Sequence, residues 1–339
     1  MPFNSFPKYT PVFLRRTNLS EYCLIVIGYL VRCSQARKQE QGQEGNEFIY
    51  QASATPGLER RVVTNIASDL GKGLLNGIGG QVGALIFNAI FPSGTPDYFN
   101  DVYKEVAKIV HKEITDNTIH EVNGKINGTK DWVAITYTNA KKSGTESKKE
   151  LTELLQPRES QIAIDLIGVL MEERFAQPGL SIFMIAASMH LAILQELAFV
   201  DPKAASPGDS SHAKSVQEYA EKYADHAKAT FDKIMKTRLD QVQPDVSFHY
   251  VNPPPDPPPH TSMYLFYFKD KFTGHEGGDY SMICSPFTGC HPKDAEEKRN
   301  EAMTKYKEDT RKDLVAKMDD PKATADEWLK LKKQPLPQE

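Results

Sequence analysis

The stretch LSIFMIAASMHLAILQELAF runs from Leu180 to Phe199 and carries one formally charged side chain, Glu196. Upstream of Glu196 there is no Lys, Arg, Asp or Glu back to Arg174. A helix that is apolar all round is either surrounded by other helices or placed in lipid. In water we expect it in the core of a bundle, because on the surface it would expose a large apolar patch. The side chains expected in that core are Phe183, Ile185, Ala186, Met189 and Leu194.

One histidine, His190, lies in the middle of this apolar stretch. A buried histidine needs a hydrogen-bond partner, so we favour a core histidine with such a partner. The alternative interpretation is a pH-sensing residue, because histidine changes charge near neutral pH.

An amphipathic helix is predicted on each side of the apolar stretch. The upstream helix is expected to begin near Pro157, and Asp165 and Glu172 would share its polar face because they are seven residues apart. A turn at Gln177-Pro178-Gly179 would join it to the apolar stretch. The apolar stripe of the upstream helix consists of Ile162, Leu166, Ile167, Leu170 and Met171. That of the downstream helix consists of Tyr219, Tyr223, Ala227, Phe231, Ile234 and Leu239.

Further upstream, another amphipathic helix is predicted from Pro96 to about Val122, ended by Asn123-Gly124. Residues 132–137 fit either a short helix or an extended stretch. Residues 73–96 carry no charge and are rich in glycine. They fit two buried helices around a glycine turn, which we favour, or a mobile apolar segment that meets lipid.

The N-terminal region has the pattern of a secretory signal peptide. Basic residues precede ten apolar or aromatic positions, Tyr22 to Val31, and small residues allow a cut after Ala36. The alternative is a buried helix or strand, and the run is too short to span a bilayer as a helix. Residues 37–61 are polar and predict a flexible pro-segment or linker, with a second candidate processing site at Arg61.

The C-terminal region differs in composition from the predicted bundle. The run NPPPDPPP at residues 252–259 predicts polyproline II and the end of the helical unit. Residues 264–268 are aromatic and strand-like, and residues 294–317 predict a charged helix packed on the outside. Cys284 and Cys290, separated by five residues, predict a small disulfide loop in an exported protein, and two free buried thiols are the alternative. The expected regions are 1–36, 37–61, 62–245 and 246–339.

Composition and motifs argue against several function classes. The chain has 339 residues, a formal net charge of −4 and no basic run with interleaved aromatics, so we expect no nucleic-acid partner. It contains no HExxH motif, no Cys-x-x-Cys pair and no G-x-S-x-G elbow. We therefore expect no enzyme activity, no cofactor and no metal site.

The order of these segments resembles the N-terminal domain of the insecticidal crystal delta-endotoxins. Residues 178–197, PGLSIFMIAASMHLAILQEL, are similar to the central hydrophobic helix of that family. Residues 86–114 resemble its earlier helical hairpin, and residues 223–242 resemble the helix that follows the central one. A looser resemblance, at Tyr280 to Cys284, is to cnidarian (jellyfish) toxins. The chain departs from the crystal toxins because it is too short for their two β-rich domains.

The resemblance implies a mainly α fold, a bundle of amphipathic helices around a central apolar helix, with a short irregular or β C-terminal extension. It also implies a pore-forming toxin or toxin-like defence protein that inserts a hairpin of about residues 158–199. In that hairpin Phe183, Ala187, His190 and Leu194 would enter lipid, whereas Asp165 and Glu172 would face the lumen. Target-membrane lipid, a surface receptor and further copies of the chain in the pore are the implied partners. The alternative function is a secreted, non-lytic helical protein that binds a partner or an apolar ligand.

Overall fold

The computed structural model describes residues 72–75, 98–112, 116–250, 262–284 and 292–337. The chain divides into two units, Met1–Thr55 and Pro56–Glu339, and all the described residues belong to the second. The predicted signal peptide, the pro-segment, both processing sites, the polyproline run and most of the glycine-rich segment lie outside the described residues.

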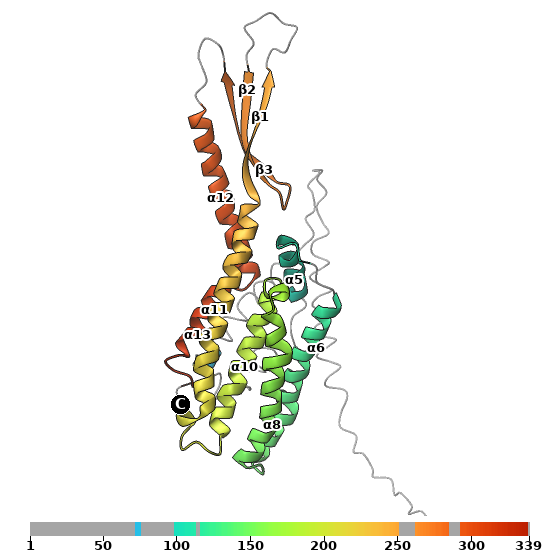
Figure 1. Ribbon diagram of the computed structural model, residues 1–339, viewed down its shortest axis with the longest axis vertical. Coiled ribbons are helices and arrows are strands. Elements are labelled where there is room, and N and C mark those ends of the chain that lie inside the picture. The colour runs from blue at the N-terminus through green and yellow to red at the C-terminus, as the bar shows by residue number, and fades with distance from the viewer. Residues whose placement is uncertain (1–71, 76–97, 113–115, 251–261, 285–291, 338–339) are drawn as a thin grey trace, which may run out of the picture. The chain divides into compact units, whose positions relative to one another are not determined.

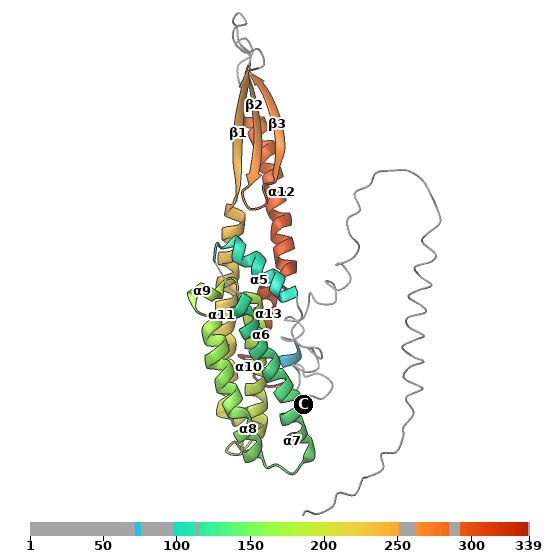
Figure 2. The ribbon, with the colours of Figure 1, turned by 90° about the vertical axis from the view of Figure 1, so that its right-hand side faces the viewer.

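The apolar stretch forms helix α10, Leu180–Val200, and every residue in it except Phe199 is buried. Figures 1 and 2 show α10 among the other helices, and it contacts α5, α8, α11 and α13. The predicted burial is confirmed, because none of the five named core residues is more than 2% exposed. The helix ends where Asp201 takes an extended backbone conformation.

The upstream helices lie along the outside of α10. In chain order, α-helices are α5 (Tyr98–Ile109), α6 (Asp116–Trp132), α7 (Thr138–Ser143), α8 (Lys148–Gln161) and α9 (Glu173–Ala176). Two π-helical turns, η1 (Val133–Tyr137) and η2 (Ile162–Gly168), continue α6 and α8. Residues 132–137 are therefore helical, which is one of the two conformations left open above.

The prediction of one helix from Pro96 to Val122 is wrong at its end. Helix α5 stops at Ile109, and His111 has a positive φ of 53°. Helix α6 then continues through Asn123-Gly124 to Trp132. Val122 and Ile126 of α6, and Val133 at the start of η1, are buried. Burial of these three side chains outweighs the roughly 1 kcal/mol by which a glycine weakens a helix interior.

Two predictions about the helix before α10 are also wrong. Helix α8 begins at Lys148, because Ser147 and Glu150 form a reciprocal capping box just before it. Pro157 therefore lies inside this helix rather than at its start. Asp165 and Glu172 do not share one helical face, because the helix is interrupted between them and Glu172 has an extended backbone. The seven-residue rule holds only along an unbroken α-helix.

Helix α11, Ser211–Asp240, lies beside α10 and leads directly into a sheet. The strands β1 (Val242–Tyr250), β2 (Ser262–Asp270) and β3 (Glu276–Cys284) form an antiparallel sheet in the order β1-β2-β3. Helix α12, Lys293–Lys317, packs on this sheet. The strand predicted at residues 264–268 is confirmed, whereas β1 and β3 were not predicted.

A last helix, α13 (Pro321–Lys330), was not predicted. Asp320 caps its start, and Trp328 is fully buried against the bundle. The Trp328 ring lies 6.4 Å from both the Phe183 and the Tyr223 ring centroids. With this helix included, the predicted fold class is confirmed: a helical bundle around one apolar helix, with a small sheet near the C-terminus.

Candidate membrane-inserting hairpin

The hairpin of about residues 158–199 consists of the end of α8, η2 and α9 on one side and α10 on the other, joined at Gln177-Pro178-Gly179. Gly179 is required at this turn because a Cβ atom there would lie 2.7 Å from the Phe175 carbonyl oxygen and 3.0 Å from a Leu170 methyl. The Gly179 N–H donates to that same carbonyl at 2.7 Å, and the Gly179 carbonyl accepts from Phe183. The turn therefore brings the two arms together through close backbone contact.

Helix α10 is long and apolar enough to cross a membrane, and it is the one such helix among the described residues. Its 21 residues extend roughly 30 Å, the thickness of a bilayer hydrocarbon core. The same length and composition also suit the central helix of a water-soluble bundle, and 94% of the most apolar stretch of α10 is buried inside the structure.

The predicted hairpin residues fall into two groups. Phe183, Ala187 and Leu194 belong to the buried core. Asp165 and Glu172 are exposed, and the Glu172 carboxylate pairs with Arg174 Nε at 2.8 Å. The exposed apolar Ile164 lies next to Asp165 in η2 and is 69% exposed.

His190 is fully buried and joins three helices by hydrogen bonds. Its Nε2 lies 2.9 Å from Glu159 Oε1 on α8, and its Nδ1 lies 2.7 Å from the Tyr223 hydroxyl on α11. The hydrogen bond from His190 lowers the pKa of Glu159, so its carboxylate can only accept. Burial raises the pKa of Tyr223, which remains a donor. A neutral imidazole with its proton on Nε2 satisfies both partners.

This geometry bears out the preferred interpretation of His190 as a core histidine with hydrogen-bond partners. The sequence alone did not indicate which partners they are. Glu159 lies on the buried face of α8, one turn after Leu155, and Tyr223 was assigned only to an apolar stripe.

A second buried polar contact lies near the end of α10. Glu196 is fully buried, and its Oε1 accepts from the Tyr137 hydroxyl at 2.6 Å and from Lys141 Nζ at 2.5 Å. Burial, together with the nearby Glu196 charge, raises the pKa of Tyr137. The contact ties α10 to η1 and α7. Its only sequence signal was that Glu196 ends the charge-free run.

The neighbouring Gln195 ties α10 to segments far away in the chain. Its side-chain amide nitrogen donates to the backbone oxygens of Leu74 and Pro335, each at 2.8 Å. Residues near both ends of the described chain therefore meet at one side chain of the central helix.

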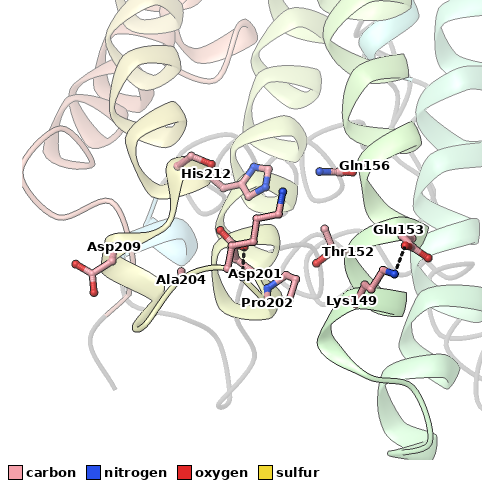
Figure 3. Close-up of a pocket in the computed structure, with 11 residues that line it drawn as sticks. Lys149, Thr152, Glu153, Gln156, Asp201, Pro202, Ala204, Asp209 and His212 are labelled. Atoms are coloured by element: carbon pink, nitrogen blue, oxygen red, sulfur yellow. Dashed lines mark hydrogen bonds and ion pairs between the residues drawn. The ribbon is translucent and has the colours of Figure 1, made fainter.

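A pocket of about 470 Å³ lies where α8 begins and where α10 connects to α11 (Figure 3). His212 and Gln156 lie on opposite sides of it, and Lys149 is already paired with Glu153. Asp201 accepts from the Ser210 hydroxyl and the Lys203 N–H, which lower its pKa. The carboxylates of Glu153 and Asp201 are thus already engaged by neighbouring groups, and the described residues contain no cluster suited to a metal ion.

Comparison with known families places this hairpin inside a matched region. A family model described as "delta endotoxin, N-terminal domain" matches residues 69–244, more than half of the chain. The match begins before α5 and ends within β1, so it includes both arms of the hairpin and excludes α12 and α13. No protein with a curated description matches the chain.

Proposed function

The chain belongs to the delta endotoxin N-terminal domain family, and on that premise we propose that it is a pore-forming toxin or toxin-like defence protein. Target-cell membrane lipid is its partner, and copies of the chain associate in the pore, with a surface receptor as a further candidate partner. The protein is secreted through residues 1–36 and processed at Ala36 or Arg61. Its inserting element is the hairpin of about residues 158–199.

The central helix is the observation that carries this proposal. Helix α10 is apolar on all sides, so lipid chains can replace the apolar contacts that it makes in the bundle. A helix of this kind loses little hydrophobic stabilisation when it exchanges a protein core for a bilayer core. The contacts that lipid cannot replace are its few polar ones.

The polar contacts divide into those that the hairpin keeps and those that it must break. The His190–Glu159 bond joins the two arms of the hairpin, so it does not have to break when the hairpin leaves the bundle. The bonds of His190 to Tyr223, of Glu196 to Tyr137 and of Gln195 to Leu74 and Pro335 all lead out of the hairpin. Opening the bundle therefore requires breaking a small set of buried hydrogen bonds.

The exposed side of the first arm supplies the polar lining. Asp165 and Glu172 stay hydrated if they face a water-filled lumen, whereas a lipid-facing carboxylate costs about 2.5–3.5 kcal/mol on insertion scales. The interruption between them leaves each free to turn toward the lumen independently.

Dye release from liposomes is the primary test. The purified chain, with and without its first 61 residues, should release dye over some range of pH and lipid composition. Absence of release under all of these conditions would contradict the proposal and favour the alternative, a non-lytic protein that binds a partner or an apolar ligand.

A tryptophan scan then tests which segment enters lipid. Ile164→Trp lies in the hairpin, and Ile135→Trp lies in η1 outside it; both positions are exposed in the bundle, 69% and 64%. Brominated lipid should quench the added fluorescence at 164 and leave that at 135 unchanged. Trp132 and Trp328 provide the background, which the unmodified chain measures. Equal quenching at the two positions would show that this hairpin is not the inserting element.

A further inference from the structure

A C-terminal segment outside the matched family region packs against the centre of the bundle. It consists of α13 and the residues that follow it, 321–337, and we call it the C-terminal clasp. The family match ends at residue 244, so the clasp lies beyond the matched domain. Helix α13 contacts both α10 and α11, and Figures 1 and 2 show it beside α11. The clasp therefore touches one helix of the proposed inserting hairpin and one helix outside it.

Polar links fix the clasp on α11. The Lys332 backbone oxygen accepts a hydrogen bond from the Gln217 side chain at 3.0 Å. Three ion pairs, each 2.6 Å long, also join the clasp to α11: Lys228–Asp326, Lys322–Asp232 and Lys332–Glu221. Their side chains are partly or fully exposed, so each pair contributes little stability and chiefly sets where the clasp lies. None of these links involves α10, so all of them can persist when α10 leaves.

The grip of the clasp on α10 is mainly apolar. Trp328 is fully buried, and its ring lies edge-on to the Phe183 ring of α10, with centroids 6.4 Å apart. The Trp328 indole N–H has no hydrogen-bond partner within the described part of the chain, so this contact is one of packing alone. A hydrogen bond of 2.8 Å from the Gln195 amide to the Pro335 backbone oxygen is the second point of contact. Phe183 and Gln195 are roughly 18 Å apart along α10, at 1.5 Å per residue, so the clasp holds the helix near both of its ends.

The connection between α12 and α13 is strained. Asp319 and Asp320 have positive φ angles, 59° and 40°, which are unfavourable for a residue with a Cβ atom. Strain of this kind persists only where the surrounding structure holds the backbone in place. The contacts of α13 with the bundle therefore act against a joint that relaxes when the clasp lets go.

We propose that the C-terminal clasp is an autoinhibitory element that keeps α10 in the bundle. It remains on α11 when the hairpin leaves, and it slows opening because Phe183 has to lose Trp328, and Gln195 has to lose Pro335, before α10 can move. A helix with a merely structural role would stabilise the whole chain alike, whereas the clasp acts on α10 selectively. The inference rests on the proposed function, because the hairpin that the clasp restrains is the inserting element proposed there.

Hydrogen exchange of the full chain without lipid tests the clasp without requiring a pore. Trp328→Ala should speed amide exchange in α10 about tenfold or more, because it removes a large buried side chain from the surface of this helix. The amides of β1, β2 and β3 should keep their exchange rates. Trp328→Phe should exchange like the unmodified chain, since it keeps an aromatic ring against Phe183 and removes only an N–H without a partner. Equal acceleration in α10 and in the sheet would overturn the inference.

Dye release tests whether the clasp restrains the hairpin. Trp328→Ala should release dye about tenfold faster than the unmodified chain. Asp270→Asn is the matched control, because it breaks the buried pair with Arg238 and destabilises the chain without touching α10 or the clasp. It should release dye at the rate of the unmodified chain, and equal acceleration by both variants would contradict the clasp. If the unmodified chain releases no dye, the pore proposal fails and hydrogen exchange alone decides on the clasp.

Trp328 itself reports whether the clasp lets go of α10, with no substitution in the clasp. The chain has two tryptophans, so Trp132→Phe leaves Trp328 as the single indole fluorophore. When vesicles are added, acrylamide should quench Trp328 more strongly, because the departure of Phe183 uncovers the ring. A Trp328 that stays shielded while dye is released would overturn the inference. Quenching by brominated lipid would also overturn it, because the clasp would then enter the bilayer together with the hairpin.

Discussion

The Tyr223 hydroxyl is the one side-chain group of α11 that holds His190 by a hydrogen bond among the described residues. It satisfies Nδ1 in a fully buried site, where an unpaired polar nitrogen is costly. It also ties the hairpin to a helix that stays outside it. A single hydroxyl therefore contributes both to stability and to keeping the bundle closed.

We predict that Tyr223→Phe destabilises the soluble bundle by about 1–3 kcal/mol, because Nδ1 of His190 loses its partner without gaining water. Urea unfolding measures this change. Tyr219→Phe is the control, since the Tyr219 ring packs edge-on against the same imidazole at 4.9 Å and its hydroxyl makes no hydrogen bond within the described part of the chain. Its effect should stay within about 0.5 kcal/mol. Similar losses of stability in both variants would contradict the role given to the Tyr223 hydroxyl.

Tyr223→Phe should also release dye from liposomes faster than the unmodified chain does.

At the scale of elements, the turn before α10 depends on the absence of a side chain. Gly179→Ala should destabilise the chain by about 1–3 kcal/mol, because its Cβ would lie 2.7 Å from the Phe175 carbonyl oxygen. Gly128→Ala, in the interior of α6, meets no atom within 4 Å and should instead stabilise by about 0.4–1 kcal/mol. Thermal unfolding of the two variants should therefore shift in opposite directions. A gain in stability from Gly179→Ala would mean that the turn relaxes freely.

At the scale of the whole molecule, one ion pair joins the bundle to the sheet. Arg238 on α11 donates two hydrogen bonds to Asp270 at the end of β2, at 3.0 and 2.6 Å, and Tyr306 on α12 donates a third at 2.8 Å. Burial acts to raise the pKa of Asp270, but the hydrogen bonds from Arg238, Thr273 and Tyr306 outweigh it and lower the pKa from 3.8 to about 2. Three elements of the chain thus meet at one carboxylate.

We predict that Asp270→Asn destabilises the chain by about 3–5 kcal/mol, because it leaves the buried Arg238 charge unpaired. Glu276→Gln, which removes an exposed pair with Lys269, should change stability by less than about 1 kcal/mol. Denaturant unfolding measures both, and equal effects would contradict the role of the buried pair.

The same carboxylate predicts a pH dependence. The folded pKa is lower than the unfolded one, so the contribution of Asp270 is present above pH 3.8 and is lost as the pH falls through about 2. The unmodified chain should lose this part of its stability in that interval, and Asp270→Asn should not. A parallel loss in both chains would assign the acid sensitivity to other groups.

The sequence by itself determined the central helix, its burial, the family and the general fold class. An uncharged run of this length has to be removed from water in any soluble fold, so composition alone was sufficient. Local sequence patterns predicted less well where individual helices begin and end. The start of α8 is set by the Ser147–Glu150 capping box rather than by Pro157, and burial on both sides of Gly124 keeps α6 helical through that glycine.

Only the tertiary structure decided what surrounds that helix. Glu159 lies 31 residues before His190 and Tyr223 lies 33 after it, and no local pattern joins positions so far apart. Helix α13 has only ten residues, and the tertiary structure alone shows that its Trp328 packs against the Phe183 and Tyr223 rings. The strands β1 and β3 depend on pairing with β2, because a strand is stabilised by its neighbours rather than by its own sequence. Apolar burial is a property of composition, whereas the partners of buried polar groups are set by the packing of the whole chain.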